Sequence, residues 1–232
     1  DLVVGESGGT IRTFQNTLPV FANPSYAEAT GAANPLSAIS VARAAPQLID
    51  LDRDGDLDMI AGASDGRLRY IRNNGGAVNP SFVEQTGSSN PFDAFSLGGA
   101  ATPTFGDLDR DGDLDMLVGQ SNGTVRYFLN VGTGAAPSFA EQSGGNNFFN
   151  GLDVGSNATP TLADIDGDGD LDAVIGNYGG IFRTFRNTGS ATAPAFTELT
   201  SSNNPFDGKD IGWSANLAFE DIDGDGDLDA VS

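Results

Sequence analysis

A nine-residue acidic segment of the form Asp-x-Asp-x-Asp-Gly-Asp-Leu-Asp recurs along this chain at a constant interval. Successive copies start at Asp50, Asp107, Asp164 and Asp221, so the interval is 57 residues each time (107 − 50, for example). A fixed period of this length indicates one small structural unit that is repeated and that buries its apolar face against its neighbours. We therefore expect the whole chain to fold as an array of similar repeats.

Other residues recur in phase with the acidic segment. A Gly ends the apolar stretch after it, a second Gly marks a tight turn, and an Arg, an Asn, a Pro-x-aromatic step and a Glu follow. These sets are Gly5, Gly62, Gly119 and Gly176; Gly9, Gly66, Gly123 and Gly180; Arg12, Arg69, Arg126 and Arg183; Asn16, Asn73, Asn130 and Asn187; Pro24, Pro80, Pro137 and Pro194; and Glu28, Glu84, Glu141 and Glu198.

The repeat boundaries follow from this phase. The first sixteen residues match the stretch that starts at Asp115, so Asp1 is predicted to end a fifth acidic segment. The repeats are then 1–57, 58–114, 115–171 and 172–228 of a single repeat domain (1–232), and 229–232 begin the next one. We expect the chain to be a window on a longer array: a larger ring, a part-ring completed by another chain, or an open fibre.

One repeat is predicted to contain four short strands. In the copy that is easiest to read they are 102–106, 116–119, 124–130 and 138–142. The acidic segment joins the first strand to the second, and a hairpin with Asn122-Gly123 at its tip joins the second to the third. No segment has a helical period. Four short antiparallel strands per repeat are typical of a β-propeller blade, so the predicted class is all-β.

The motifs resemble those of the FG-GAP or VCBS-type repeat family. The resemblance lies in Pro-x-x-x followed by the acidic segment, a small apolar strand, Gly, a turn Gly, Arg-x-aromatic-x-Asn and Pro-x-Phe, and it covers essentially the whole chain. It implies integrin-α-like propeller blades, calcium between the first and second strands of a blade, and an adhesive or ligand-binding role. The commonest ring of this family has seven blades, which four repeats do not supply.

The acidic segments have the ligand chemistry of a calcium site. Ca²⁺ takes six to eight oxygens at roughly 2.3–2.6 Å, and alternating Asp side chains on a tight turn can converge on one point. The ninth-position Asp is expected to close the site, while the resemblance implies that the seventh residue adds its backbone carbonyl and points its side chain outward. One Ca²⁺ is predicted in each of the four segments, with these candidate ligand residues: Asp50, Asp52, Asp54, Asp56, Asp58, Asp107, Asp109, Asp111, Asp113, Asp115, Asp164, Asp166, Asp168, Asp170, Asp172, Asp221, Asp223, Asp225, Asp227 and Asp229.

Two other interpretations of these segments are weaker. An EF-hand needs Glu at position twelve between helices, whereas Ala61 stands there between predicted strands. An acidic turn without metal does not require four copies in phase, each with its Gly. Without metal, each close carboxylate pair would cost about 1 kcal/mol in bulk water and about 4 kcal/mol at an effective dielectric constant near 20. Calcium is therefore expected to stabilise the fold.

Composition excludes several classes of function. The chain has no Cys and no His, so disulfides, thiolate metal sites and the usual general base are absent. Its 32 acidic residues face 11 basic ones, for a formal charge of −21, and 20 of those acids lie in the four segments. Four Ca²⁺ would change the charge from −21 to −13. Binding to nucleic acid or to an anionic membrane is not expected, and no apolar stretch is long enough to insert into a membrane.

The recurrent residues outside the segments suggest packing more than recognition. Arg and Glu are expected to be hydrogen-bonding struts from blade to blade, with a ligand-binding ring as the alternative. Phe14, Ile71, Phe128 and Phe185 are expected to pack between blades, and the recurrent Asn to end a strand or cap a turn. The segments 34–36, 90–93, 147–150 and 204–207 carry Asn near an apolar side chain, which suits either a sugar site or a loop pinned by a buried ring. Trp213 is a contact residue or a plug.

Three functions remain in order of preference. The first is a secreted, calcium-stabilised scaffold for adhesion or for surface or fibre assembly, whose partners are other copies or further repeats. The second is a carbohydrate-binding propeller that takes glycans between blades. The third is an enzyme, which would depend on a carboxylate pair such as Asp207 and Asp210, and we predict that the chain is not one. Asn122 and Asn157 lie in glycosylation sequons, with Asn122 exposed at a hairpin tip.

Overall fold

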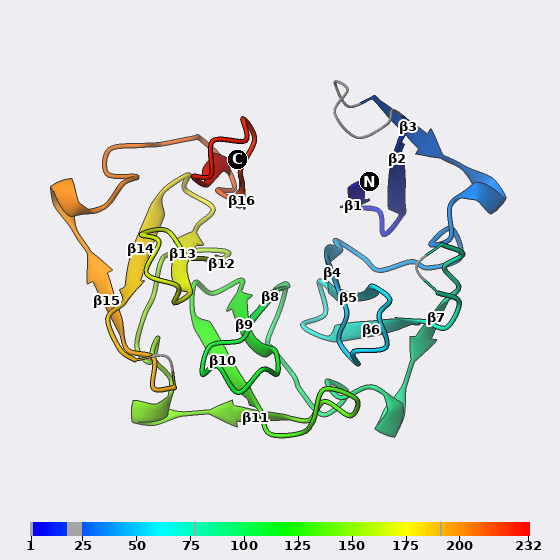
Figure 1. Cartoon of the computed structure of the whole chain (residues 1–232), viewed down its shortest axis with the longest axis horizontal. Helices are drawn as coiled ribbons and strands as arrows, with labels where there is room; N and C mark the ends of the chain where they lie inside the picture. The colour runs from blue at the N-terminus through cyan, green and yellow to red at the C-terminus, as the bar shows by residue number, and fades with distance from the viewer. Residues whose placement is uncertain (1, 18–24, 77, 191) are drawn as a thin grey trace. The chain divides into compact units, whose positions relative to one another are not determined.

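The structure is a computed structural model that describes residues 2–17, 25–76, 78–190 and 192–232. Asp1, which was predicted to end a fifth acidic segment, and Pro24 of the first Pro-x-aromatic step lie outside the described residues. The chain divides into an N-terminal unit, Asp1–Ala101, and a C-terminal unit, Thr102–Ser232. Each unit consists of antiparallel sheets in which strands follow one another in chain order, as Figure 1 shows.

The N-terminal unit holds two sheets. The first has three strands and the second has four, and we call each sheet with its loops a blade. A single turn of 3₁₀ helix follows the last strand of each blade. The elements are β1 (Leu2–Gly5), β2 (Ile11–Asn16), β3 (Tyr26–Ala29) and η1 (Gly31–Ala33), then β4 (Ala45–Ile49), β5 (Asp58–Gly62), β6 (Leu68–Asn73), β7 (Phe82–Gln85) and η2 (Gly87–Ser89).

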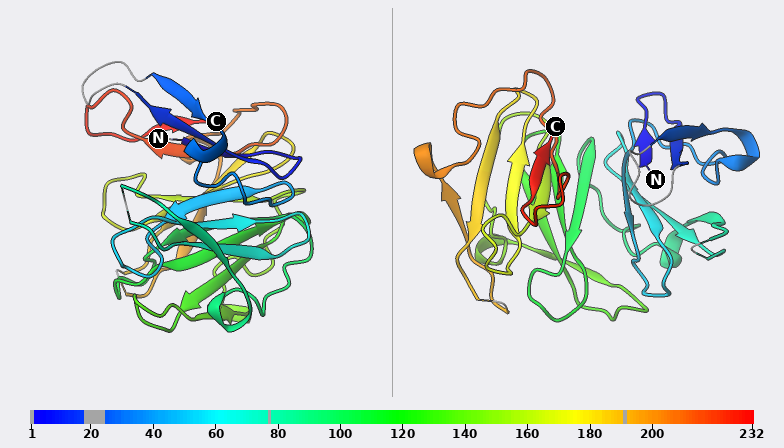
Figure 2. Two further views of the ribbon diagram at one scale, coloured as in Figure 1. Left: turned by 90° about the vertical axis from the view of Figure 1, so that its right-hand side faces the viewer. Right: turned by 45° about the horizontal axis from the view of Figure 1, so that its top comes forward.

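The C-terminal unit holds two four-stranded blades and a two-stranded sheet. Figure 2 shows these sheets from two further sides, with the yellow arrows of β13 and β14 side by side. The elements are β8 (Ala101–Gly106), β9 (Asp115–Gln120), β10 (Val125–Asn130), β11 (Phe139–Gln142), η3 (Gly144–Asn146), β12 (Thr159–Ala163), β13 (Asp172–Gly176), β14 (Phe182–Asn187), β15 (Phe196–Leu199), η4 (Ser201–Asn203), β16 (Ala218–Glu220) and β17 (Asp229–Val231).

The predicted fold class, all-β propeller blades of antiparallel strands that repeat with the sequence, is confirmed: three of the described sheets have four strands, whereas β1–β3 has three and β16–β17 has two. The four strands predicted at 102–106, 116–119, 124–130 and 138–142 are β8 to β11, and each begins and ends within one residue of its predicted position. The described helices are single 3₁₀ turns, and within these residues no helix is long and apolar enough to cross a membrane.

Apolar side chains pack between neighbouring blades of each unit. In the N-terminal unit Ile11 of β2 lies in one buried cluster with Met59 and Ile71 of the next blade. In the C-terminal unit Leu117 of β9 and Phe185 of β14 share another cluster. The second strand of each four-stranded blade is buried on both faces, which explains its continuous apolar sequence. The expected packing of Ile71 and Phe185 between blades is thus confirmed.

The glycine that ends the second strand permits this close packing. A Cβ added at Gly119 would lie 2.0 Å from the backbone oxygen of Ala158 in the next blade, and one added at Gly176 would lie 2.2 Å from that of Ala215. No side chain fits at these separations. The turn glycine combines this close approach with a positive φ: Gly123 adopts φ +87° at the tip of the β9–β10 hairpin, and a Cβ added there would overlap the backbone oxygen of Gly155.

Candidate metal centres

Each acidic segment joins the first strand of a blade to the second. Segment 50–58 connects β4 to β5, segment 107–115 connects β8 to β9, segment 164–172 connects β12 to β13, and segment 221–229 connects β16 to β17. The ninth Asp is the first residue of the second strand in all four cases. The two strands therefore fix both ends of the loop, and the eight residues between them are free to form a turn.

The same hydrogen bonds shape all four loops. The Gly at the sixth position donates its N–H to the first Asp at 2.9–3.1 Å, and the seventh residue donates its N–H to the fifth at 2.8–3.1 Å. These glycines have φ between +89° and +97°, a region that other residues rarely adopt. Local turn chemistry thus curls each segment and brings several of its carboxylates toward one point.

Three carboxylates converge in every loop. Their oxygens lie within 4.8 Å of one another in the groups Asp50, Asp52 and Asp54; Asp107, Asp109 and Asp111; Asp164, Asp166 and Asp172; and Asp221, Asp223 and Asp225. Two oxygens held by one Ca²⁺ at roughly 2.3–2.6 Å can be up to about 5 Å apart, so this spacing suits calcium. The donor set consists only of oxygen, which is the preference of a hard cation.

Two buried oxygens test whether a cation fits. Among the residues that the structure describes, Oδ1 of Asp50 and Oδ1 of Asp107 are buried and accept no hydrogen bond. The other oxygen of each carboxylate accepts the N–H of the loop glycine, from Gly55 at 3.1 Å and from Gly112 at 3.0 Å. A buried carboxylate oxygen without a donor is costly unless a cation or water meets it. The residues therefore fit a bound Ca²⁺.

The ninth Asp also holds the loop onto the third strand. Asp58 is fully buried, and its carboxylate accepts the backbone N–H of Asn73 at 2.8 Å and the hydroxyl of Tyr70 at 2.8 Å. Asp115 accepts the N–H of Asn130 at 2.8 Å, and Asp172 that of Asn187 at 2.7 Å. Sequence reasoning assigned this residue to the metal and missed its strand contacts, although the recurrent Asn was a signal for them.

Burial also changes the acidity of this residue. It raises the pKa of Asp58 to about 6 and that of Asp115 to about 7, although the backbone hydrogen bonds from Asn73 and Asn130 act in the opposite direction. It raises the pKa of Asp172 as well. Because a carboxylate must lose its proton to bind a cation, a proton and Ca²⁺ compete wherever the ninth Asp is a ligand.

The seventh-position residues Asp56, Asp113, Asp170 and Asp227 are not members of the converging groups. The carboxylate of Asp170 instead pairs with Arg110 at 2.8 Å. Arginine enters two of the loops directly: Arg72 pairs with Asp52 at 2.7 Å and Asp54 at 3.1 Å, and Arg186 pairs with Asp166 at 2.5 Å. Sequence reasoning missed these arginines because only alternate repeats have them. In the other repeats Gln15 and Leu129 occupy the same position.

The recurrent Arg and Glu pair with each other across strands of one blade, which corrects the expectation that they are struts between blades. Arg183 of β14 donates to both oxygens of Glu198 on β15, at 2.6 and 2.7 Å, and its guanidinium lies 5.6 Å from the centre of the Phe185 ring. The register explains this, because Glu198 lies opposite Phe185 and thus diagonally across from Arg183. The same third-to-fourth-strand ion pair joins Arg12 to Glu28, Arg69 to Glu84 and Arg126 to Glu141. Arg183 in addition donates to the backbone carbonyl of Asp153, in the connection between β11 and β12, at 3.1 Å.

The recurrent Asn caps a turn, as predicted. Oδ1 of Asn130 accepts the N–H of Gly132 at 3.1 Å and that of Ser138 at 3.0 Å, which fixes the turn between β10 and β11. Asn73 and Asn187 make the corresponding bonds. Together with the ninth Asp, these residues connect the acidic loop, the third strand and the start of the fourth strand in one hydrogen-bonded network.

The Asn residues at 34, 90, 147 and 204 are engaged with the backbone. Asn90 donates to the carbonyl of Leu68 at 3.2 Å and accepts the N–H of Phe92 at 2.9 Å, and the Phe92 ring is buried against Tyr70. The other three make equivalent bonds. Of the two interpretations of these segments, this geometry favours the loop pinned by a buried side chain.

Three further predicted features lie at the surface. Trp213 is 77% exposed and meets Tyr178 edge-on at a centroid distance of 5.0 Å, so it is not a plug. Asn122 is exposed at the β9–β10 hairpin, as predicted, whereas Asn157 is half-buried. Asp207 and Asp210 are both exposed, and Asp210 accepts the N–H of Gly212 at 2.8 Å. Nothing in these contacts brings Asp207 and Asp210 together as a catalytic pair.

Comparison with known proteins agrees with the blades and their acidic loops. A model of the FG-GAP-like repeat family matches residues 50–118, 107–175 and 164–232. These matches cover more than half of the chain, which therefore belongs to the FG-GAP-like repeat family. The chain is also similar to integrin alpha-4 of Xenopus laevis, with 30% identity over 142 residues. That match covers 56% of this chain and 14% of the integrin, so the chain spans a small part of the length of that relative.

Proposed function

We propose that this chain is a calcium-stabilised scaffold of FG-GAP blades that acts outside the cell, in adhesion or in assembly with further repeats or other copies. The observation that carries the proposal is the pair of buried oxygens on Asp50 and Asp107, which accept no hydrogen bond within the described residues. Each belongs to a group of three converging carboxylates. A divalent cation satisfies these oxygens and removes the repulsion between the carboxylates.

Recurrence supports a structural role for the cation. The same loop stands at the same strand junction in every repeat, and its ninth Asp is bonded to the third strand in the three four-stranded blades. A cation bound in the loop would therefore tie three strands of a blade together. A single catalytic centre would instead need residues that differ between repeats, and the exposed Asp207 and Asp210 do not supply one.

Location and role rest on two further arguments. The similarity to integrin alpha-4 supports a place at the cell surface and a part in adhesion. Calcium sites of extracellular modules bind at about 10⁻⁴–10⁻³ M, a range that suits exposed loops such as 221–229.

Thermal unfolding with and without calcium tests the scaffold. At about 100 times Kd, calcium adds about 2.7 kcal/mol per site to the free energy of unfolding, so the melting temperature rises strongly over that in chelator. Magnesium at the same concentration is the control, because it is smaller and keeps its water. An equal melting temperature in calcium and in chelator rules out the proposal.

Assembly has a separate test. Negative-stain electron microscopy of the chain, in calcium and in chelator, is expected to show chains of blades or multimers that depend on calcium. Single particles at every calcium concentration would refute assembly while leaving the calcium-stabilised scaffold intact.

Carbohydrate binding is the second candidate, and one observation favours it. Trp213 and Tyr178 form an exposed aromatic pair, which suits stacking against a sugar ring, and the polar residues Lys209 and Asp210 precede Trp213 in the sequence. In this proposal the aromatic pair, and not the pinned Asn segments, would contact the sugar. A glycan array should give signals that disappear in Trp213→Ala, whereas no binding at millimolar sugar counts against this function.

A further inference from the structure

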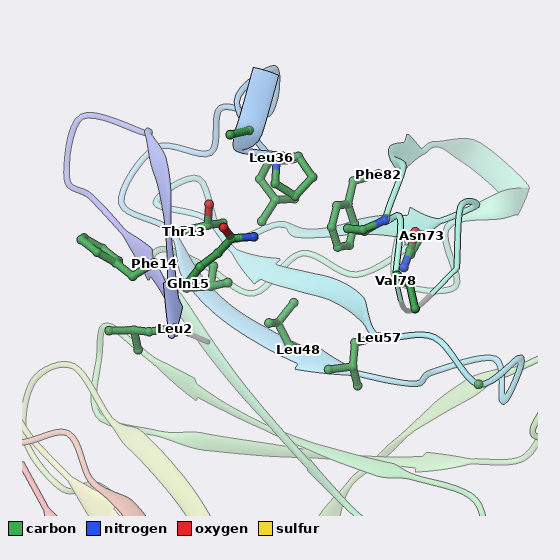
Figure 3. Close-up of a pocket in the computed structure, with 15 residues that line it drawn as sticks. Leu2, Thr13, Phe14, Gln15, Leu36, Leu48, Leu57, Asn73, Val78 and Phe82 are labelled. Carbon is green, nitrogen blue, oxygen red and sulfur yellow. The ribbon is translucent and has the colours of Figure 1, made fainter. Parts of the chain in front are cut away.

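A cavity of about 310 Å³ lies in the N-terminal unit between the β1–β3 blade and the β4–β7 blade. Figure 3 shows Leu36 and Phe82 on one side of it and Leu48 and Leu57 opposite them. Its size is at the lower end of the ~300–1,000 Å³ typical of ligand pockets, and its lining is mostly apolar with a few polar groups. Gly55 and Leu57 come from the first acidic loop, so the cavity borders a candidate calcium site.

The same place between the two four-stranded blades of the C-terminal unit is filled by side chains. Tyr127 lies 5.0 Å from Phe148, ring centre to ring centre, and Phe148 lies 5.4 Å from Phe196. Leu129 packs against the same buried cluster. At the corresponding repeat positions the N-terminal unit has Thr13 in place of Tyr127, Pro35 in place of Phe148 and Gln15 in place of Leu129. The cavity therefore takes the place of two aromatic rings and one aliphatic side chain.

A threonine in the wall of this space has a hydroxyl oxygen that the surrounding atoms cover. Thr13 lines the cavity and is 9% exposed, and among the described residues its Oγ1 has no hydrogen-bond partner. Thr184 occupies the same repeat position in the C-terminal unit, where its hydroxyl bonds to Oδ1 of Asn204 at 2.8 Å. Buried polar groups are nearly always hydrogen-bonded, so Thr13 marks a place where a partner is missing.

We propose that this cavity binds a neutral phenol: one aromatic ring in the place of the Phe148 and Tyr127 rings, with its hydroxyl bonded to Thr13 after rotation of the Thr13 side chain brings Oγ1 to the cavity. The formal charge of −21 and the adjoining acidic loop disfavour an anionic ligand. The phenol can be a free small molecule or the tyrosine side chain of a bound peptide, since both present the same group. The site does not depend on the scaffold role proposed above.

Binding of p-cresol and toluene to the full chain in calcium tests the site, with saturation-transfer NMR as the readout. We expect a Kd on the order of millimolar for p-cresol, as for other ligands of this size without charged contacts. Thr13→Val keeps the shape and removes the hydroxyl, so p-cresol should bind about fivefold more weakly while toluene is unchanged.

A second variant fills the cavity. Pro35→Phe combined with Gln15→Leu copies the packing of the C-terminal unit, and both ligands should lose binding while circular dichroism shows a folded chain. Val83→Thr, at an exposed position on β7 that does not line the cavity, should bind both ligands normally. Undetectable binding of p-cresol to the folded parent chain, or undiminished binding to the filled variant, overturns the proposal.

N-acetyltyrosinamide separates the two sources of a phenol. If it binds more tightly than p-cresol, the site accepts a tyrosine side chain on a backbone. If it binds more weakly, the site accepts a free phenol.

Discussion

At the residue scale, five aspartates of one loop have different environments although they are the same amino acid. The first, Asp107, has one oxygen bonded to Gly112 and one without a donor among the described residues. The ninth, Asp115, is buried and bonded to the third strand. The seventh, Asp113, serves the loop through its backbone N–H. Position in the turn, rather than residue type, decides which carboxylates converge in the loop.

Asp107→Asn should therefore change stability in opposite directions with and without calcium. The amide keeps the shape but binds Ca²⁺ poorly, so calorimetric titration should find one site fewer or a site at least about tenfold weaker. In chelator the variant should be more stable than the parent, by about 1 kcal/mol or somewhat more, because a repulsive charge is gone. Asp93→Asn, at an exposed position outside the loops, is the control. Loss of stability in chelator would contradict this assignment.

Glu198→Gln should reveal the Arg–Glu pair through pH. The hydrogen bond from Arg183 holds the pKa of Glu198 below its usual 4.5. A carboxylate with a lowered pKa in the folded state stabilises the fold above its unfolded pKa, and this contribution is lost as pH falls. The variant should lose about 0.5–1 kcal/mol at pH 7, since the pair is partly exposed.

Urea unfolding of parent and variant between pH 3 and pH 7 provides the measurement. The two curves should converge as the pH falls through the lowered pKa of Glu198, since Glu198 then carries its proton in both the folded and the unfolded state. Glu220→Gln, at an exposed position on β16, should show no such convergence. A difference that stays constant down to pH 3 would mean that Glu198 acts through packing instead of charge.

At the element scale, one blade is held together by contacts that its own repeat supplies. The ninth Asp joins the acidic loop to the third strand, the recurrent Asn joins the third strand to the turn before the fourth, and the Arg–Glu pair joins the third strand to the fourth. Contact with the next blade depends on apolar side chains, on glycines that bring two backbones together, and on polar contacts such as the Arg110–Asp170 ion pair. Blade formation and blade packing therefore respond to different substitutions.

Gly119→Ala should destabilise the packing of two blades. Its Cβ would lie 2.0 Å from the Ala158 carbonyl oxygen, so the backbone must move, at a cost of about 1–3 kcal/mol or more. Gly145→Ala is the matched control, because a Cβ there meets nothing within 4 Å. Urea unfolding of both variants measures the difference. Equal stability of the two would show that the blades do not approach so closely in solution.

At the scale of the whole molecule, the acidic loops dominate the electrostatics. Outside the four segments, 12 acidic residues face 11 basic ones, whereas the segments contribute 20 acids. The net charge of −21 is thus concentrated at one junction of each repeat. Like charges held close together oppose folding until a counter-ion screens or binds them.

Salt should therefore replace part of the effect of calcium. In chelator, raising the ionic strength from about 0.01 M to about 1 M shortens the Debye length from about 30 Å to about 3 Å, and the melting temperature should rise. In saturating calcium the same change should have little effect, because the loops are already neutralised in part. A melting temperature in chelator that falls with salt would indicate that attractive ion pairs outweigh loop repulsion.

The sequence by itself determined the period, the strand order within a blade and the turn chemistry of the acidic loops. These depend on neighbours in the chain: a Gly with positive φ at Gly55, Asp side chains that accept nearby N–H groups, and the alternation of short strands with turns. The same local logic predicted the capping role of Asn130 and the exposure of Asn122.

Tertiary structure decided what each repeated residue touches across strands and blades. Only the register of β14 and β15 places Glu198 beside Arg183 of its own blade. Sequence reasoning had instead assigned these two residues to contacts between blades. Only packing shows that Asp58 is buried and bonded to Asn73, and that Thr13 lines a cavity where Tyr127 faces rings. Such contacts join residues far apart in sequence, and a repeat pattern fixes the identity of the residues but not the space between them.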